Sequence, residues 1–142
     1  KVVTGDGPAL DRLRAAFPQV HFLGRRGGAE LAACYAGADV FVFPSRTDTF
    51  GLVLLEALAS GLPVAAYPVA GPLDVLKDCE AAALRHDLLE ACLTALELDP
   101  KQAIEHARRY SWQATTQQFL ANLYPNPARN ELPKTLAKTP AA

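Results

Sequence analysis

The sequence predicts an α/β fold in which a parallel β-sheet is flanked by helices. Short apolar runs alternate with segments of helical periodicity along most of the chain, which is typical of strand–helix–strand units. Residues 40–43 form an unbroken apolar run, as expected of a parallel strand that is covered on both faces. The helix expected at 51–60 is apolar nearly all round, which places it at the centre of the fold.

The remaining elements follow from the same periodicities and from the glycines and prolines that bound them. Strands are also expected at 2–4, 20–23, 63–67 and 81–84, and helices at 8–17, 30–36, 71–76, 88–98, 100–110 and 111–123. Ser111 is expected to cap the last helix, with Trp112, Phe119 and Leu123 as its anchors. Residues 1–124 are therefore predicted to form one Rossmann-like domain, and residues 125–142, rich in proline and lysine, a disordered tail.

Composition excludes several classes of function. The net charge is −1, with 14 basic and 15 acidic residues, so no overall attraction to nucleic acid or to an anionic membrane is expected. No apolar run reaches the roughly 18 residues of a membrane span. The three cysteines match no metal-binding spacing, and we expect reduced cytosolic thiols and no metal site built by the protein. The chain opens on what looks like a strand in progress and contains no methionine, which predicts a fragment of a longer protein.

Ligands of parallel sheets bind outside the carboxyl ends of the strands, here at the loops that begin at Gly5, Gly24, Pro44 and Pro68. The turn of residues 5–8 has two glycines but not the third glycine of a dinucleotide fingerprint, nor the lysine of a P-loop. It is either a plain tight turn or a turn whose glycines let a ligand approach the backbone.

The loop at residues 45–51 and the helix after it carry the charged candidates. Glu56 interrupts an apolar helix, so a buried carboxylate there would need a partner: the vicinal hydroxyls of a ribose, or a backbone amide or basic side chain of the protein. The free amides at the helix start suit a diphosphate. Asp48 is either a ligand contact or simply a capping acid, and Arg46 either reaches the phosphates or is a solvated side chain.

Residues 43–66 closely resemble the signature of glycosyltransferase family 4. That signature is a Glu-x7-Glu motif around a Phe-Gly-Leu helix start, followed by Glu-Ala-x-Ala-x-Gly-x-Pro-Val, and it stands here as FPSRTDTFGLVLLEALASGLPVAA. The resemblance extends to the turn at 5–8, to residues 71–75 and to the helix that begins at Ser111, and it covers residues 2–124. Two positions depart from the pattern: Asp48 replaces the usual first glutamate, and Thr49 stands where glycine is common.

The resemblance implies a GT-B architecture, in which two Rossmann-like domains enclose the active site and the carboxy-terminal domain binds the nucleotide-sugar donor. This chain would be that carboxy-terminal domain without its amino-terminal part. Asp48 is then implied as the catalytic carboxylate at the donor sugar and Glu56 as the ligand of the ribose hydroxyls. The remaining implied donor contacts are the backbone amides of Phe50, Gly51 and Leu52, the turn glycines Gly5 and Gly7, and, at the base, Arg25.

The implied activity is transfer of a sugar from a UDP- or GDP-sugar to an acceptor hydroxyl, with retention of configuration and with no metal or other cofactor. The acceptor would be a saccharide or glycolipid, and the enzyme would be cytoplasmic, with the inner face of the membrane as an option through the missing domain. The chain alone would bind donor weakly and transfer little. Two alternatives stay open, a non-catalytic nucleotide- or sugar-binding module and a GT-B nucleotide-sugar epimerase.

Overall fold

The computed structural model describes residues 1–123, and the chain divides into two compact units, Lys1–Tyr110 and Ser111–Ala142. The disordered tail predicted for residues 125–142 lies outside the described residues. The single domain predicted for residues 1–124 extends past the division between the units and stays a prediction.

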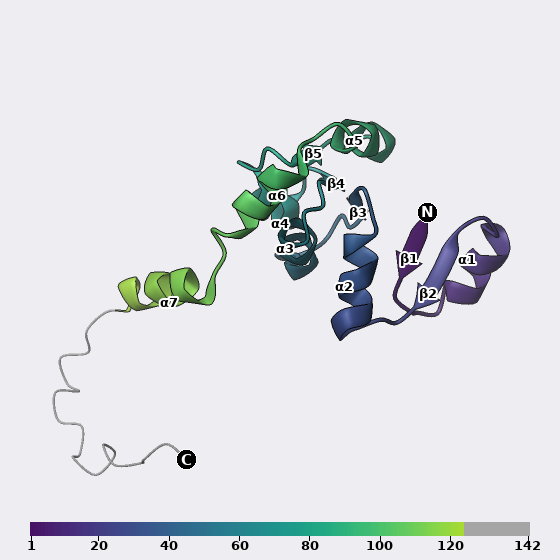
Figure 1. The fold of residues 1–142 in the computed structure, drawn as a ribbon, viewed down its shortest axis with the longest axis horizontal. Helices are drawn as coiled ribbons and strands as arrows, with labels where there is room; N and C mark the ends of the chain where they lie inside the picture. Colours follow the sequence, from purple (N-terminus) through teal and green to yellow (C-terminus); the bar gives the residue numbers. More distant parts are fainter. Residues whose placement is uncertain (124–142) are drawn as a thin grey trace, which may run out of the picture. The chain divides into compact units, whose positions relative to one another are not determined.

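All five predicted strands form within the first unit, and every pairing is parallel (Figure 1). β1 (Val2–Thr4) pairs with β2 (His21–Gly24), whereas β3 (Phe41–Phe43), β4 (Val64–Ala66) and β5 (Ala82–Leu84) form a three-stranded sheet in that order. The predicted α/β class with parallel strands is confirmed. The strands are divided between two sheets rather than joined in one, since no pairing links β2 to β3 within residues 1–123.

Helices separate the strands as the sequence predicts, with ends that differ from the predicted ones by a few residues. They are α1 (Leu10–Ala16), α2 (Gly28–Ala36), α3 (Leu52–Ala59), α4 (Ala70–Leu76), α5 (Leu88–Ala95), α6 (Pro100–Ala107) and α7 (Trp112–Ala121). The predicted cap of α7 is confirmed, because Ser111 Oγ accepts a hydrogen bond of 3.1 Å from the backbone amide of Ala114.

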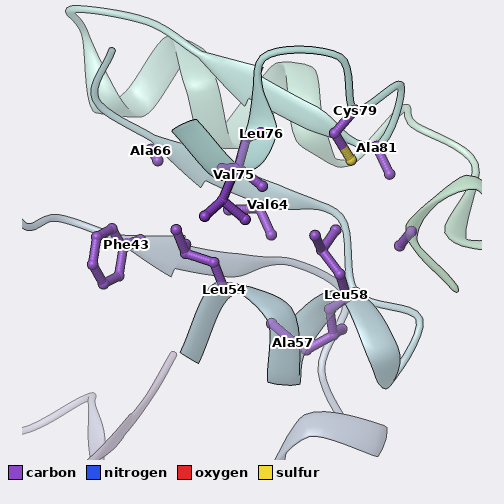
Figure 2. Close-up of a cluster of buried hydrophobic side chains, with 12 residues drawn as sticks. Phe43, Leu54, Ala57, Leu58, Val64, Ala66, Val75, Leu76, Cys79 and Ala81 are labelled. Carbon is purple, nitrogen blue, oxygen red and sulfur yellow. The ribbon is translucent and has the colours of Figure 1, made fainter. Parts of the chain in front are cut away.

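The main hydrophobic core lies where β3 and β4 meet α3 and α4 (Figure 2). Its largest fully buried side chains include Leu54 and Leu58 of α3, Val64 of β4, and Val75 and Leu76 of α4. Successive side chains of a strand point to opposite faces, so β4 also contributes Ala65 to a second cluster of small residues with β5 and α5. Burial on both faces makes β4 the central strand of its sheet and fixes β3, and the loop after it, at the edge.

Two expectations about burial are wrong. Val42 of β3 is 42% exposed, because β3 is an edge strand with one covered face. Leu52, at the start of α3, is 67% exposed, so that helix packs with one side only. The expected anchors of α7 are Trp112, Phe119 and Leu123. Because α7 is the only helix or strand that the structure describes in the second unit, their role as anchors stays a prediction.

Helix α6 is tied to the end of α4 through a buried histidine. His106 is only 4% exposed, its Nε2 lies 2.8 Å from the carbonyl oxygen of Val75, and the Tyr110 hydroxyl donates to the same oxygen at 3.2 Å. Carbonyls in the last turn of a helix lack intrahelical partners, so these two bonds satisfy one that would otherwise be unpaired. His106 therefore has a structural role. None of the helices in residues 1–123 is both long and apolar enough to cross a membrane.

Candidate functional site

The loop between β3 and α3 is folded by its own aspartate. Asp48 Oδ1 accepts a hydrogen bond of 3.0 Å from the backbone amide of Phe50, a local side-chain turn that short acids favour. The capping alternative is wrong for the helix, since the residue at the N-cap of α3 is Gly51 and Asp48 bonds an amide within the loop instead. The Phe50 amide, predicted to face the donor, is instead bonded to Asp48 in this structure.

Helix α3 begins at a glycine that no other residue could replace without strain. Gly51 precedes the helix with φ +79°, and a Cβ there would lie 2.9 Å from Leu54 Cδ1. Within residues 1–123, no backbone acceptor pairs with the amides of Gly51 and Leu52. These two predicted donor contacts are therefore open N–H groups at a helix start, where an anion is favoured.

Helix α4 packs against the backbone of this loop at Gly71. A Cβ on Gly71 would lie 2.9 Å from the carbonyl oxygen of Asp48 and 3.3 Å from the amide nitrogen of Phe50, so only glycine permits this approach. On the same sheet edge, the Arg46 guanidinium carbon lies 4.1 Å from the ring centroid of Tyr67, the residue that follows β4. Arg46 is exposed, as expected for a solvated side chain, and the cation–π contact holds its positive charge at the carboxyl ends of β3 and β4.

Glu56 has a protein partner, but not of the predicted kind. Its side chain is exposed rather than buried, because α3 packs with one side only, and its Oε2 accepts a hydrogen bond of 3.1 Å from the hydroxyl of Tyr35 in α2. The two residues line a surface cavity of about 370 Å³ between α2 and α3. The other lining residues are Gly28, Leu31, Ala32 and Ser60.

Tyr35 is the residue of this site that the sequence analysis missed. Its pKa is raised to about 12, first by burial, then by the hydrogen bond to Glu56 and by the negative charge of that carboxylate. The hydroxyl therefore remains a protonated donor throughout the neutral range. The sequence feature that could have pointed to Tyr35 is its spacing from Leu31. The two residues are four apart, so they lie on one face of α2 and can line the same surface.

We expect Glu56→Gln to lower the pKa of Tyr35, because the variant removes the negative charge that opposes phenolate formation. Burial, the largest cause, persists, so the pKa should stay above its ordinary value. In the wild type the folded state holds the phenol proton more tightly than the unfolded chain. The stability from this pair is therefore complete below about pH 10 and is lost as the pH rises towards 12. Phenolate absorbance against pH, with Tyr35→Phe to assign the transition, measures this; an unchanged transition in Glu56→Gln would contradict the pairing.

The predicted donor contacts Gly5, Gly7 and Arg25 follow β1 and β2, the strands of the two-stranded sheet. The Gly5 amide donates a 2.8 Å hydrogen bond to the carbonyl oxygen of Gly24, and Gly7 accepts one of 3.0 Å from the Leu10 amide. A Cβ on Gly5 or on Gly7 would meet nothing within 4 Å, so the space beside the turn is open. Arg25 is exposed directly after β2. Within residues 1–123, no hydrogen bond joins this group to Asp48 or Glu56.

The part of the chain that the structure describes contains neither a metal-binding cluster nor an activated cysteine. No group of three His, Cys, Asp or Glu side chains in residues 1–123 could hold a metal ion. Cys34, Cys79 and Cys92 are all unpaired. Burial raises the pKa of the Cys79 thiol, which makes it a poor nucleophile.

The known proteins that the chain resembles in sequence or in fold are glycosyltransferases. The family described as "Glycosyl transferases group 1" matches residues 1–97. The chain is 37% identical to a sulfoquinovosyl transferase of Arabidopsis thaliana, over 79% of the chain and 25% of that protein. It is 36% identical to a GDP-mannose-dependent alpha-mannosyltransferase of Mycolicibacterium smegmatis, over 87% of the chain and 32% of that protein.

Among solved structures, the chain resembles a pneumococcal O-GlcNAc transferase crystallised with UDP and GlcNAc. The TM-score is 0.63 at 20% identity, over 85% of the chain and 29% of that protein, and the likeness shows a shared fold. The chain thus spans about a quarter to a third of the length of these known proteins.

Proposed function

The chain belongs to the group 1 glycosyl transferases, and from this membership we propose that it forms the donor-binding part of an enzyme that transfers a sugar from a nucleoside diphosphate sugar to an acceptor hydroxyl. The observation that carries the proposal is Glu56, a carboxylate on the wall of an open cavity. Tyr35 binds one of its oxygens, and within residues 1–123 the other has no hydrogen-bond donor. A carboxylate in this state suits the vicinal hydroxyls of a ribose.

The diphosphate would lie at the start of the same helix. Leu52 and Glu56 are both exposed and lie four residues apart, so they share one face of α3 and are separated by about 6 Å along its axis. A ribose and its 5′ carbon can bridge that distance. The open amides of Gly51 and Leu52 would then bind phosphate oxygens, and Arg46, which belongs to the same loop and stacks on Tyr67, would add a positive charge. We further assign Gly5 and Gly7 to the pyrophosphate and Arg25 to the base.

In the reaction, the chain would mainly hold the donor and stabilise the departing diphosphate. The amides at the helix start can donate hydrogen bonds to its negatively charged oxygens. Asp48 would contact the donor sugar, and transfer would proceed with retention and without a protein-bound metal. The chain would be part of the carboxy-terminal domain of a two-domain protein in the cytoplasm, and the amino-terminal domain would bind the saccharide or glycolipid acceptor. The similar proteins that use GDP-mannose, or that bind UDP, support a UDP- or GDP-sugar as donor.

One observation favours a second candidate, a binding module without chemistry. The Asp48 carboxylate already has a structural task, because it caps the Phe50 amide, and this task needs no substrate. A module of this kind would bind a nucleoside diphosphate through Glu56 and would release no sugar. Transfer assays on Asp48 variants separate the two candidates.

We expect Glu56→Ala to weaken the binding of UDP or GDP by at least about tenfold, the effect of losing hydrogen bonds to a charged group. The measurement is isothermal titration with the full-length protein that contains this chain. Glu105→Ala, which removes an exposed carboxylate from α6, is the matched control and should bind as the wild type does. Equal affinities of Glu56→Ala and wild type would exclude the ribose assignment.

A further inference from the structure

We infer that Tyr35 is a positioning residue for donor binding: its hydroxyl holds the Glu56 carboxylate in the orientation that receives the ribose. The inference rests on the proposed function of Glu56 and adds a residue from a different helix. The bond joins Tyr35 Oη to Glu56 Oε2 at 3.1 Å, across 21 residues of sequence.

The tyrosine ring is fixed by the core and not by the solvent-exposed surface. Tyr35 packs against the main hydrophobic cluster, and its ring meets that of Phe41 edge-on, with centroids 5.8 Å apart. Phe41 in turn lies beside Phe43, whose side chain is buried. The hydroxyl therefore has a defined position relative to β3, the strand that leads into the loop of residues 45–51.

Glu56 gains most from such a partner. An exposed glutamate has several rotamers of similar energy, and ordering it on ligand binding would cost conformational entropy. A hydrogen bond that already selects one rotamer removes part of this cost, which is how preorganisation raises affinity. The bond uses Oε2 and leaves Oε1 without a hydrogen-bond donor within residues 1–123, so the carboxylate is held without being saturated.

The alternative is that the bond merely ties α2 to α3. The cavity argues against this, because the two helices leave a space of about 370 Å³ beside the Tyr35–Glu56 pair. Its wall combines the pair with the small or apolar residues Gly28, Leu31 and Ala32 of α2. A bond placed at an open, ligand-sized recess is better explained by what enters the recess than by helix packing.

A double-mutant cycle tests the inference, with Tyr35→Phe, Glu56→Gln and the double variant titrated with UDP and GDP in the full-length protein. We expect Tyr35→Phe to weaken binding about three- to tenfold, and to have no further effect once Glu56 is glutamine. Tyr110→Phe, which removes a hydroxyl that bonds the Val75 carbonyl instead, is the matched control and should leave affinity unchanged. Should Tyr35→Phe fail to fold, Tyr35→Leu, which keeps an apolar side chain against the core but has no hydroxyl for Glu56, must weaken binding to the same extent.

The outcomes separate this inference from the proposed function. If Glu56→Gln weakens binding and Tyr35→Phe does not, or if the two effects simply add, Tyr35 does not act through Glu56 and the inference is overturned while the function stands. If neither variant changes the affinity, the ribose assignment fails, and the role of Tyr35 fails with it.

Discussion

Replacing Asp48 by alanine should reduce sugar transfer by about a hundredfold, the usual cost of removing one preorganised polar group from a reaction centre. The variant removes two things at once, the negative charge and the acceptor of the Phe50 amide. Asp48→Asn separates them, because asparagine keeps an oxygen that can cap the amide but carries no charge. If Asp48 acts on the donor sugar, the asparagine variant should be nearly as impaired as the alanine variant.

Release of nucleoside diphosphate from a UDP- or GDP-sugar, with the full-length protein, measures this effect. Nucleotide affinity, titrated in parallel, shows whether the loop has kept its shape. Wild-type activity in Asp48→Asn together with a loss in Asp48→Ala would show that only the cap matters. That result would remove Asp48 from the chemistry and favour the non-catalytic module.

The second large effect is expected from a residue that need not touch the donor. Gly71→Ala introduces a Cβ at 2.9 Å from the Asp48 carbonyl oxygen, and because that atom belongs to the backbone, the loop itself has to move. A displacement of the loop misplaces Asp48 and the open amides of Gly51 and Leu52 together. Since misplacing a reactive group by about 1 Å can cost a hundredfold, we expect transfer to fall ten- to a hundredfold.

Gly37→Ala is the matched control, because its Cβ would lie 3.4 Å from the Ala33 carbonyl oxygen, an acceptable contact at the end of α2. Urea unfolding of both variants shows whether the fold is retained. Unchanged transfer in Gly71→Ala would mean that the position of the loop does not matter to the donor site.

The sequence predicted the elements well because their signals are local. Each of the five strands and seven helices formed within a few residues of its expected bounds, and the cap at Ser111 formed as expected. The signature at 43–66 is also local, because it consists of consecutive residues of one strand, one loop and one helix, and this made it specific. The family it resembles agrees with the match to residues 1–97.

Burial and long-range pairing could not be predicted in the same way. An apolar composition does not show which side of α3 is covered, and the exposed Leu52 and Val53 made Glu56 look more buried than it is. The partner of Glu56 lies 21 residues away on another helix, and only the packing of Tyr35 on Phe41 brings it there. The contact of Arg46 with Tyr67 likewise depends on the pairing of β3 with β4.

The central claim is that Glu56 recognises a ribose, and the most direct test compares a nucleoside diphosphate with its 2′,3′-dideoxy form. Wild-type full-length protein should bind the ribonucleotide at least about tenfold more tightly, since the dideoxy form has no 2′ or 3′ hydroxyl to donate to the Glu56 oxygen that Tyr35 leaves without a donor. In Glu56→Ala the preference should disappear, with both ligands bound about equally. A wild type that does not distinguish the two ligands, or a preference that survives in Glu56→Ala, would contradict the account.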